Sequence, residues 1–271
     1  MTFRYRTLLA AAAGVLALAA PAEAQAPTKF RLTLGYDGKL LIKVLDVNVT
    51  QTADDNGFST QVRLRSYGVL EAFKKIRQTA SGSGRIDGGV ARPGVFTQQN
   101  IDGERNRKVR VTWTGSDVVT AATPSYGNMG FPPATRAQKL EAVDPITALM
   151  RFTLMDRPAQ ACAGSMKFFD GKRRYDLVFS NRAVRAPNAR EQRLGLTSPV
   201  TCSVTYRELA GFKRKKPGDK PGQGLKNLRM AFARHGQGGP WVISSITGGT
   251  PLGDATIELA RLSTSGETPE N

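Results

Sequence analysis

The residues of this chain that could do chemistry are two cysteines, one histidine and its acids. Cys162 and Cys202 are the only cysteines, and His235 is the only histidine. One histidine cannot build a metal centre alone, and the Cys/His spacing of zinc sites is absent. No phosphate-binding loop, dinucleotide fingerprint or serine nucleophile elbow occurs. We therefore expect no catalytic residue, no metal and no cofactor.

Most of the acids stand where local structure uses them. Asp144 precedes Pro145 at the start of a helical pattern, which is the place of an N-cap. Four other acids belong to expected turns because a glycine follows each of them: Asp37, Asp87, Asp102 and Asp170. A pair of carboxylates that hydrolyses a glycosidic bond is recognised by its separation in space, which a sequence does not give. A cell-wall glycan hydrolase therefore stays open as one hypothesis.

The first 24 residues have the pattern of a secretory signal peptide. Arg4 and Arg6 precede an alanine-rich apolar run, and Ala22–Ala24 has the A-x-A form of a cleavage site. The run is too short for a bilayer-spanning helix, which needs about 20 apolar residues. We expect cleavage after Ala24, export to the periplasm and a mature protein that does not span the membrane.

The two cysteines lie in the part that would be exported. An even pair of cysteines in an oxidising compartment normally forms a disulfide. We expect a bond between Cys162 and Cys202, worth roughly 4 kcal/mol in the chain-entropy account of a loop of this length. Two buried free thiols are the alternative.

The chain is strongly basic, with a formal net charge of +17. Losing Arg4, Arg6 and Glu23 with the signal peptide would leave +16, because two positive charges and one negative charge go. Export excludes nucleic acid and leaves anionic envelope lipid or lipopolysaccharide as the expected partner. The alternative is that these cations are ordinary solvated faces. The candidate residues for an anionic surface fall in three segments: Arg105, Arg107, Lys108, Lys172, Arg173, Arg174, Lys213, Arg214, Lys215 and Lys216.

Short strands are the elements that must position these residues. Alternating polar and apolar runs, separated by turn signals, recur along the chain. The expected strands are 29–36, 40–52, 59–65, 108–113, 118–121, 166–169, 173–179, 200–209, 228–234, 241–246 and 255–262. So many strands in series predict a mainly β fold, a strongly curved antiparallel sheet that forms a half-barrel or open barrel. We expect a single β-rich domain over 25–263 and a disordered tail over 264–271.

Two segments have helical periodicity instead. Gly68–Ile76 predicts a short amphipathic helix. Asp144–Met155 predicts a helix with apolar side chains on nearly every side except at Arg151, so we expect the curved sheet to bury it. Its residues that would either fill the core or line a ligand cavity are Ile146, Leu149, Met150 and Phe152.

The chain resembles a known family, most specifically from Val143 onward. The motifs that carry the resemblance are Asp144–Leu149, Cys162, the D-G-K-R-R-Y-D-L run over Asp170–Leu177, Cys202–Tyr206, Ala210–Phe212, Trp241 and Thr250–Gly253. They are similar to a bacterial periplasmic family described as domain of unknown function 3108. The resemblance implies a half-barrel like that of lipoprotein carriers, and it implies no reaction, ligand or catalytic residue.

Three functional hypotheses follow. The first is an exported, non-enzymatic binding protein that holds a lipid-like or amphipathic ligand. The second is a structural protein that supports the envelope through an unknown envelope protein. The third is the glycan hydrolase. A cavity beside the Asp144 helix would favour the first, a solid core the second, and two close carboxylates in a cleft the third.

Overall fold

The computed structural model describes residues 29–73, 75–101, 106–156, 161–214, 226–250 and 253–265. The predicted signal peptide and its cleavage site lie outside these ranges. So do Arg105, Lys215 and Lys216 of the basic segments. None of the helices in these ranges is both long and apolar enough to cross a membrane.

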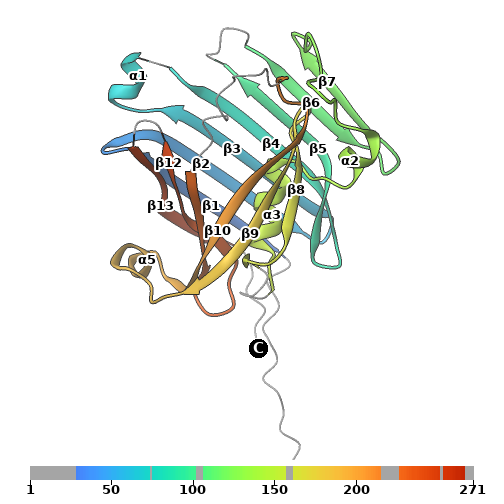
Figure 1. Cartoon of the computed structure of the whole chain (residues 1–271). Coiled ribbons are helices and arrows are strands. Elements are labelled where there is room, and N and C mark those ends of the chain that lie inside the picture. Colours follow the sequence, from blue (N-terminus) through green and yellow to red (C-terminus); the bar gives the residue numbers. More distant parts are fainter. Residues whose placement is uncertain are drawn as a thin grey trace, which may run out of the picture.

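Every strand in the described ranges belongs to one antiparallel sheet (Figure 1). The strands are β1 (Phe30–Lys39), β2 (Lys43–Asp54), β3 (Gly57–Ser66), β4 (Arg77–Asp87), β5 (Val90–Asn100), β6 (Lys108–Trp113), β7 (Val118–Thr123), β8 (Ser165–Phe169), β9 (Arg174–Val184), β10 (Leu196–Ala210), β11 (Lys226–His235), β12 (Trp241–Thr250) and β13 (Gly253–Ser265). Their order in space is β7-β6-β5-β4-β3-β2-β1-β13-β12-β11-β10-β9-β8. The sheet therefore consists of two meanders that join where β1 pairs with β13.

The prediction of a mainly β, antiparallel fold is confirmed, but the predicted strong curvature is wrong. The sheet is neither closed nor strongly curled, and its edge strands β7 and β8 do not pair. The chain between these edges, residues 124–164, crosses from one to the other. Val143 of this segment forms a parallel bridge with Phe168 of β8. The bridge lies on the edge of β8 that does not pair with β9, which is the edge that would pair with β7 in a closed barrel. The crossing segment therefore pairs with the free edge of β8 at Val143.

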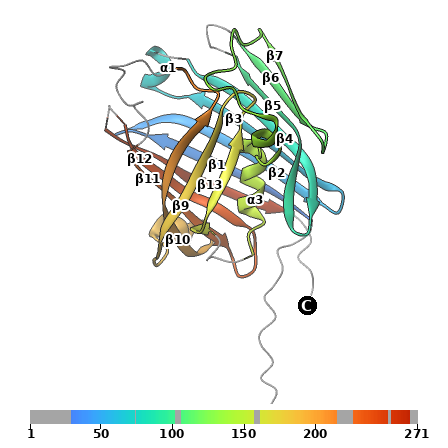
Figure 2. The same cartoon turned by 45° about the vertical axis from the view of Figure 1, so that its right-hand side comes forward.

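The predicted buried helix is α3 (Pro145–Thr153), which lies on the inner face of the sheet (Figures 1 and 2). Asp144 is its N-cap, as predicted, and its Oδ1 accepts hydrogen bonds from the backbone N–H groups of Ile146 at 2.9 Å and Thr147 at 2.7 Å. The helix contacts β3, β4 and β5 of one meander and β8 and β12 of the other. It therefore fills the space between the two halves of the sheet.

Three shorter helices accompany α3 in the described ranges. The predicted helix near 68–76 is α1 (Val69–Phe73). The other two, α2 (Arg136–Leu140) and α5 (Ala189–Arg193), each begin with a capping box, formed by Thr135 with Gln138 and by Asn188 with Glu191. A serine, threonine or asparagine followed three residues later by Glu or Gln is the sequence signal that would have predicted both.

The two cysteines form the predicted disulfide, with Cα atoms 5.2 Å apart. Cys202 is fully buried in β10, and Cys162 lies in the segment that follows α3. The bond therefore ties the crossing segment to the second meander.

The end of the sheet differs slightly from the predicted end of the domain. Strand β13 runs to Ser265, two residues beyond 263, because Thr264 and Ser265 pair with Leu32 and Arg31 of β1. The rest of the predicted tail lies outside the described residues.

Candidate functional site

A partly open, apolar cavity of about 160 Å³ lies between α3 and the inner face of the sheet. Its walls come from β1, β2, β3, α3, β12 and β13, and all of its described lining residues are aliphatic or phenylalanine except Tyr36, Gln51 and Thr153. A dry cavity of ~150 Å³ in another protein holds benzene. The cavity therefore has room for a small apolar group, such as a ring or a short length of acyl chain.

The residues that line the cavity differ in exposure. Leu34 and Val49 are buried. Val62, Ile246 and Ile257 also line the cavity but are only half-buried, so part of its wall is accessible to solvent. Aliphatic side chains that stay half-exposed on an inner sheet face gain free energy when an apolar ligand covers them.

The structure separates the four predicted cavity residues into two pairs. Leu149 and Phe152 line the cavity. Ile146 and Met150 are buried in the core clusters instead, at 6% and 0% exposure. Helical periodicity predicted a buried helix, but it did not distinguish the face toward the cavity from the face toward packed strands.

The cavity also contains a polar residue that sequence reasoning missed. Gln51 is 1% exposed, and its Oε1 accepts a hydrogen bond from Thr153 Oγ1 at 2.9 Å. Its Nε2 has no partner among the described residues. The sequence feature that could have identified Gln51 is its position in a series of inward-facing residues, where alternation predicts apolar side chains: Val47, Val49, Gln51 and Ala53.

Asp144, at the start of α3, has an unusual protonation equilibrium. Its side chain is fully buried, and this burial raises its pKa from 3.8 to about 6, although hydrogen bonds from Thr147 and Ile146 oppose the shift. The carboxyl group receives two backbone N–H groups and the Thr147 hydroxyl. Because it is enclosed and occupied as a cap, it has no open position for a substrate.

The raised pKa of Asp144 predicts a pH-dependent stability. The folded protein holds this proton more tightly than the unfolded chain, so this contribution to the free energy of unfolding is largest below pH 3.8 and is lost as the pH rises to about 6. The loss should be roughly 3 kcal/mol. Asp144→Asn, which keeps an N-cap oxygen, should remove this slope. Chemical denaturation across the interval measures it, and equal slopes in both proteins would contradict it.

The three basic segments, which are far apart in the sequence, meet around one loop. The Arg107 guanidinium carbon lies 4.5 Å from the ring centroid of Tyr126, and the Lys172 Nζ lies 5.2 Å from the same centroid. Arg173 stands 5.9 Å from the ring of Phe212.

The third basic segment completes this surface. Arg214 lies 4.8 Å from the ring of Phe131, and the Phe131 N–H donates to the Phe212 carbonyl oxygen at 2.9 Å. Lys213 is exposed between Phe212 and Arg214. We define the basic–aromatic strip as the set that these contacts connect: Arg107, Tyr126, Phe131, Lys172, Arg173, Phe212 and Arg214. The predicted residues Lys108 and Lys213 are exposed, and no described contact places either of them in the strip.

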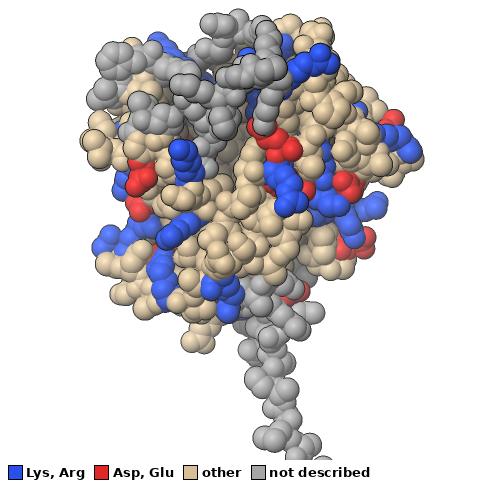
Figure 3. All heavy atoms as spheres, viewed as in Figure 1, with Lys and Arg blue, Asp and Glu red and all other residues tan. Residues whose placement is uncertain are grey.

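One acid stands within the strip. Asp170 Oδ1 accepts the backbone N–H groups of Lys172 at 3.0 Å and Arg173 at 2.7 Å, so its main contacts hold the β8–β9 turn. Burial, and then the charge of Asp170, raise the pKa of Tyr126. Figure 3 shows Lys and Arg spread over one face of the molecule with Asp and Glu among them. The strip is therefore distinguished by its aromatic rings and not by cations alone.

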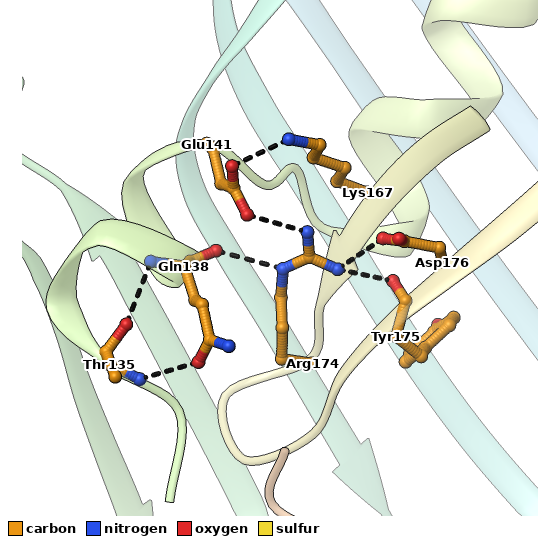
Figure 4. A network of polar contacts seen from close by, with 7 residues as sticks. All are labelled: Thr135, Gln138, Glu141, Lys167, Arg174, Tyr175 and Asp176. Atoms are coloured by element: carbon orange, nitrogen blue, oxygen red, sulfur yellow. Dashed lines mark hydrogen bonds and ion pairs between the residues drawn. The ribbon is translucent and has the colours of Figure 1, made fainter. Parts of the chain in front are cut away.

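Arg174, predicted as a surface cation, is buried at 1% exposure, so that prediction is wrong (Figure 4). Arg173 is exposed just before β9, whereas Arg174, the first residue of β9, is buried. Its Nη1 lies 2.5 Å from Asp176 Oδ1, and its Nη2 lies 2.9 Å from Glu141 Oε1. Its Nε donates to the Gln138 carbonyl oxygen of α2 at 3.0 Å. Arg174 therefore binds α2 to β9 and is not available to a partner.

A pair of acids relevant to the hydrolase hypothesis faces across β1 and β2. Asp37 lies opposite Asp46, and the Lys43 Nζ is 2.7 Å from Asp37 Oδ1 and 3.2 Å from Asp46 Oδ1. Burial alone would raise the pKa of Asp46, but hydrogen bonds from Lys43 and Asn48 hold that pKa below its ordinary value. A glycosidase acid needs a raised pKa, so this pair is an ion-pair cluster. In the described part of the chain, no group of three or more His, Cys, Asp or Glu side chains could hold a metal.

Comparisons with known proteins give a family and several similar solved structures. The family model for "Protein of unknown function (DUF3108)" matches residues 29–188, which spans β1 to β9 and ends before β10. A solved structure, the beta-barrel-like protein of domain of unknown function DUF1849 from Brucella abortus, is similar at 12% identity with a TM-score of 0.48, covering 90% of this chain and 100% of that chain. No curated protein matches the chain.

Proposed function

This chain belongs to the DUF3108 family, and we propose that it is an exported, non-enzymatic binding protein that holds the apolar part of a lipid-like ligand. The observation that carries the proposal is the apolar cavity beside α3. Its half-exposed aliphatic walls suit a chain or ring that arrives from water. By analogy with lipoprotein carriers, the proposed ligand class is a molecule that bears an acyl chain.

Export to the periplasm belongs to the proposal as well. The disulfide between Cys162 and Cys202 supports it, because structural disulfides persist in oxidising compartments. The charged start, alanine-rich run and A-x-A pattern before Gln25 support it independently.

Mass spectrometry tests the ligand directly. Protein purified from the periplasm should carry an acyl-bearing molecule that native mass spectrometry and organic extraction both detect. Val62 is a half-buried residue of the cavity wall, so Val62→Trp places an indole against the cavity, and we expect it to lower the bound fraction at least about tenfold by excluding the chain.

A matched substitution separates cavity filling from a general effect of tryptophan. Val119 is 53% exposed on β7, outside the cavity, so Val119→Trp should retain the ligand. Wild-type protein that yields no ligand and binds no fluorescent fatty-acid probe would exclude the proposal. In that case the second hypothesis, a structural protein whose inner face is filled by α3, becomes the better account.

The second part of the proposal assigns the basic–aromatic strip to anionic envelope lipid or lipopolysaccharide. Each Lys or Arg held near an anionic membrane contributes about 1 kcal/mol, and aromatic rings favour the interface. We expect Arg173→Glu with Arg214→Glu to weaken association with phosphatidylglycerol vesicles by more than about tenfold at low salt. Association should fade as added salt screens the charges over ~8 Å.

The control for this prediction is an equal change of charge elsewhere. Arg31 and Arg63 are exposed in a polar groove on the outer face of β1 to β3. Arg31→Glu with Arg63→Glu alters the net charge by the same amount and should have a much smaller effect in vesicle co-sedimentation. An equal loss in both double variants would mean that net charge, and not the strip, governs association.

A further inference from the structure

One strongly buried hydrogen-bonding group among the residues that line the cavity has no partner in the described part of the chain. Gln51 is 1% exposed on the inner face of β2, and its Nε2 has no partner among the described residues. Leaving a buried N–H unpaired costs free energy, and most buried polar groups in proteins have partners. An amide at this position therefore calls for a partner that the described residues do not supply.

The orientation of the amide is held by α3. Thr153 Oγ1 lies 2.9 Å from Gln51 Oε1 and 3.1 Å from the Leu149 carbonyl oxygen, one helical turn earlier. The oxygen end of the amide is thus bonded to the helix. The Nε2 end is buried without a partner among the described residues, and Gln51 lines a cavity whose other walls are mainly hydrocarbon.

A second unsatisfied group stands next to the first. Thr60 lies directly opposite Gln51 in the β2–β3 register, is fully buried, and its Oγ1 has no partner among the described residues. Directly opposite side chains on one sheet face have Cβ atoms about 4.5–5.5 Å apart. Gln51 and Thr60 therefore form a pair of neighbouring polar side chains on this apolar face, each with one atom that lacks a partner among the described residues.

We infer that Gln51 donates a hydrogen bond from Nε2 to a carbonyl oxygen of the ligand, so that the cavity selects acyl compounds over hydrocarbons of the same length. This inference rests on the proposed function, and it adds the chemical class of the ligand. The apolar walls bind the chain, while the amide recognises the one oxygen that distinguishes an acyl group. A hydrocarbon in the same place leaves the Nε2 group unpaired, which lowers its affinity.

The test compares three small probes on the mature, disulfide-bonded protein by displacement of an apolar fluorescent dye. Methyl octanoate should bind about tenfold more tightly than octane, after correction for their transfer from water, because one buried hydrogen bond is at stake. Gln51→Leu should remove this preference while leaving octane affinity the same or higher. Gln61→Leu, the same change at an exposed site on β3, should leave the preference intact.

Two further arms distinguish recognition from docking of the helix. Thr153→Val breaks the bond to α3 but keeps the Gln51 N–H groups, so it should preserve the preference for the ester. If it abolishes the preference as Gln51→Leu does, Gln51 acts through helix position and the inference fails. A wild-type preference for octanol over methyl octanoate would mean that the cavity presents a hydrogen-bond acceptor to the ligand and not a donor. That result would also overturn the inference. If the ester and octane bind with equal affinity, the inference is wrong but the proposed function is retained. If neither probe binds, both the inference and the proposed function are wrong.

Discussion

Replacing Arg174 with methionine is expected to lower the free energy of unfolding by about 3–5 kcal/mol, because it removes one partner of a buried ion pair. Asp176 would lose its partner at Nη1, and the Gln138 carbonyl of α2 would lose its donor. Glu141 is more exposed and retains Lys167 at 2.6 Å, so most of the cost falls on Asp176 and on the contact with α2. Urea denaturation followed by circular dichroism measures the change.

The neighbouring residue provides the control for this experiment. Arg173 precedes Arg174 and is exposed, so Arg173→Met should change the free energy of unfolding by less than about 0.5 kcal/mol. Arg174→Lys should fall between the two, since lysine keeps the charge but cannot reproduce the fork of donors. Equal effects at positions 173 and 174 would show that the buried network does not hold the sheet to α2.

Cys202→Ser is expected to lower the free energy of unfolding by about 4 kcal/mol, because it returns the conformational freedom of a loop of about 40 residues to the unfolded chain. Cys202 is fully buried and joins the segment after α3 to β10. Thermal and urea denaturation of protein purified from the periplasm should both detect the loss. Wild-type protein treated with a thiol reductant should approach the stability of the variant, while the variant itself should not respond to the reductant. An unchanged melting temperature in the variant would mean that the bond has no structural role.

Local patterns predicted the strands in which polar and apolar residues alternate along the sequence. Residues 59–65 and 108–113 alternate cleanly, and they lie in β3 and β6. Strand β4 was missed because its sequence, Arg77–Asp87, contains Gly82 and Gly84 and almost no apolar residues. It is a strand because β3 and β5 pair with it on both sides.

The glycines of β4 reflect packing and not flexibility. A Cβ at Gly82 would lie 3.0 Å from the Ile146 Cβ, so α3 sits directly on this strand. A Cβ at Gly84 would lie 1.9 Å from the Arg92 carbonyl oxygen of β5. Such contacts join residues that are distant in the sequence, and no local pattern predicts them.

The Asp-Gly turn signals were reliable only where no partner strand competes. Asp170 holds the turn between β8 and β9 as predicted. Asp37 and Gly38 were expected to form a turn, yet they continue β1, because β2 and β13 pair with them from both sides. Tertiary pairing overrides the local preference of these two residues.

Local sequence predicted some features of the candidate sites and not others. The disulfide and the burial of α3 followed from residue type and periodicity. The strip did not, because Arg107, Lys172 and Arg214 come together only through the packing of three turns around Tyr126 and Phe131. The different environments of Arg173 and Arg174 could have been predicted, because neighbouring residues of the strand predicted over 173–179 must face opposite sides.

The pairing of β1 with β13 has a consequence for how the protein is made. The first strand of the sheet hydrogen-bonds to the last, along a register from Arg31 with Ser265 to Lys39 with Thr256. Domains are synthesised from the N-terminal end, and an unpaired strand edge is a template for aggregation. A nascent chain of this protein therefore carries the open edge of β1 until its final strand emerges. The fold is completed at the centre of the sheet, and a chain that stops short of β13 leaves two meanders without the seam that joins them.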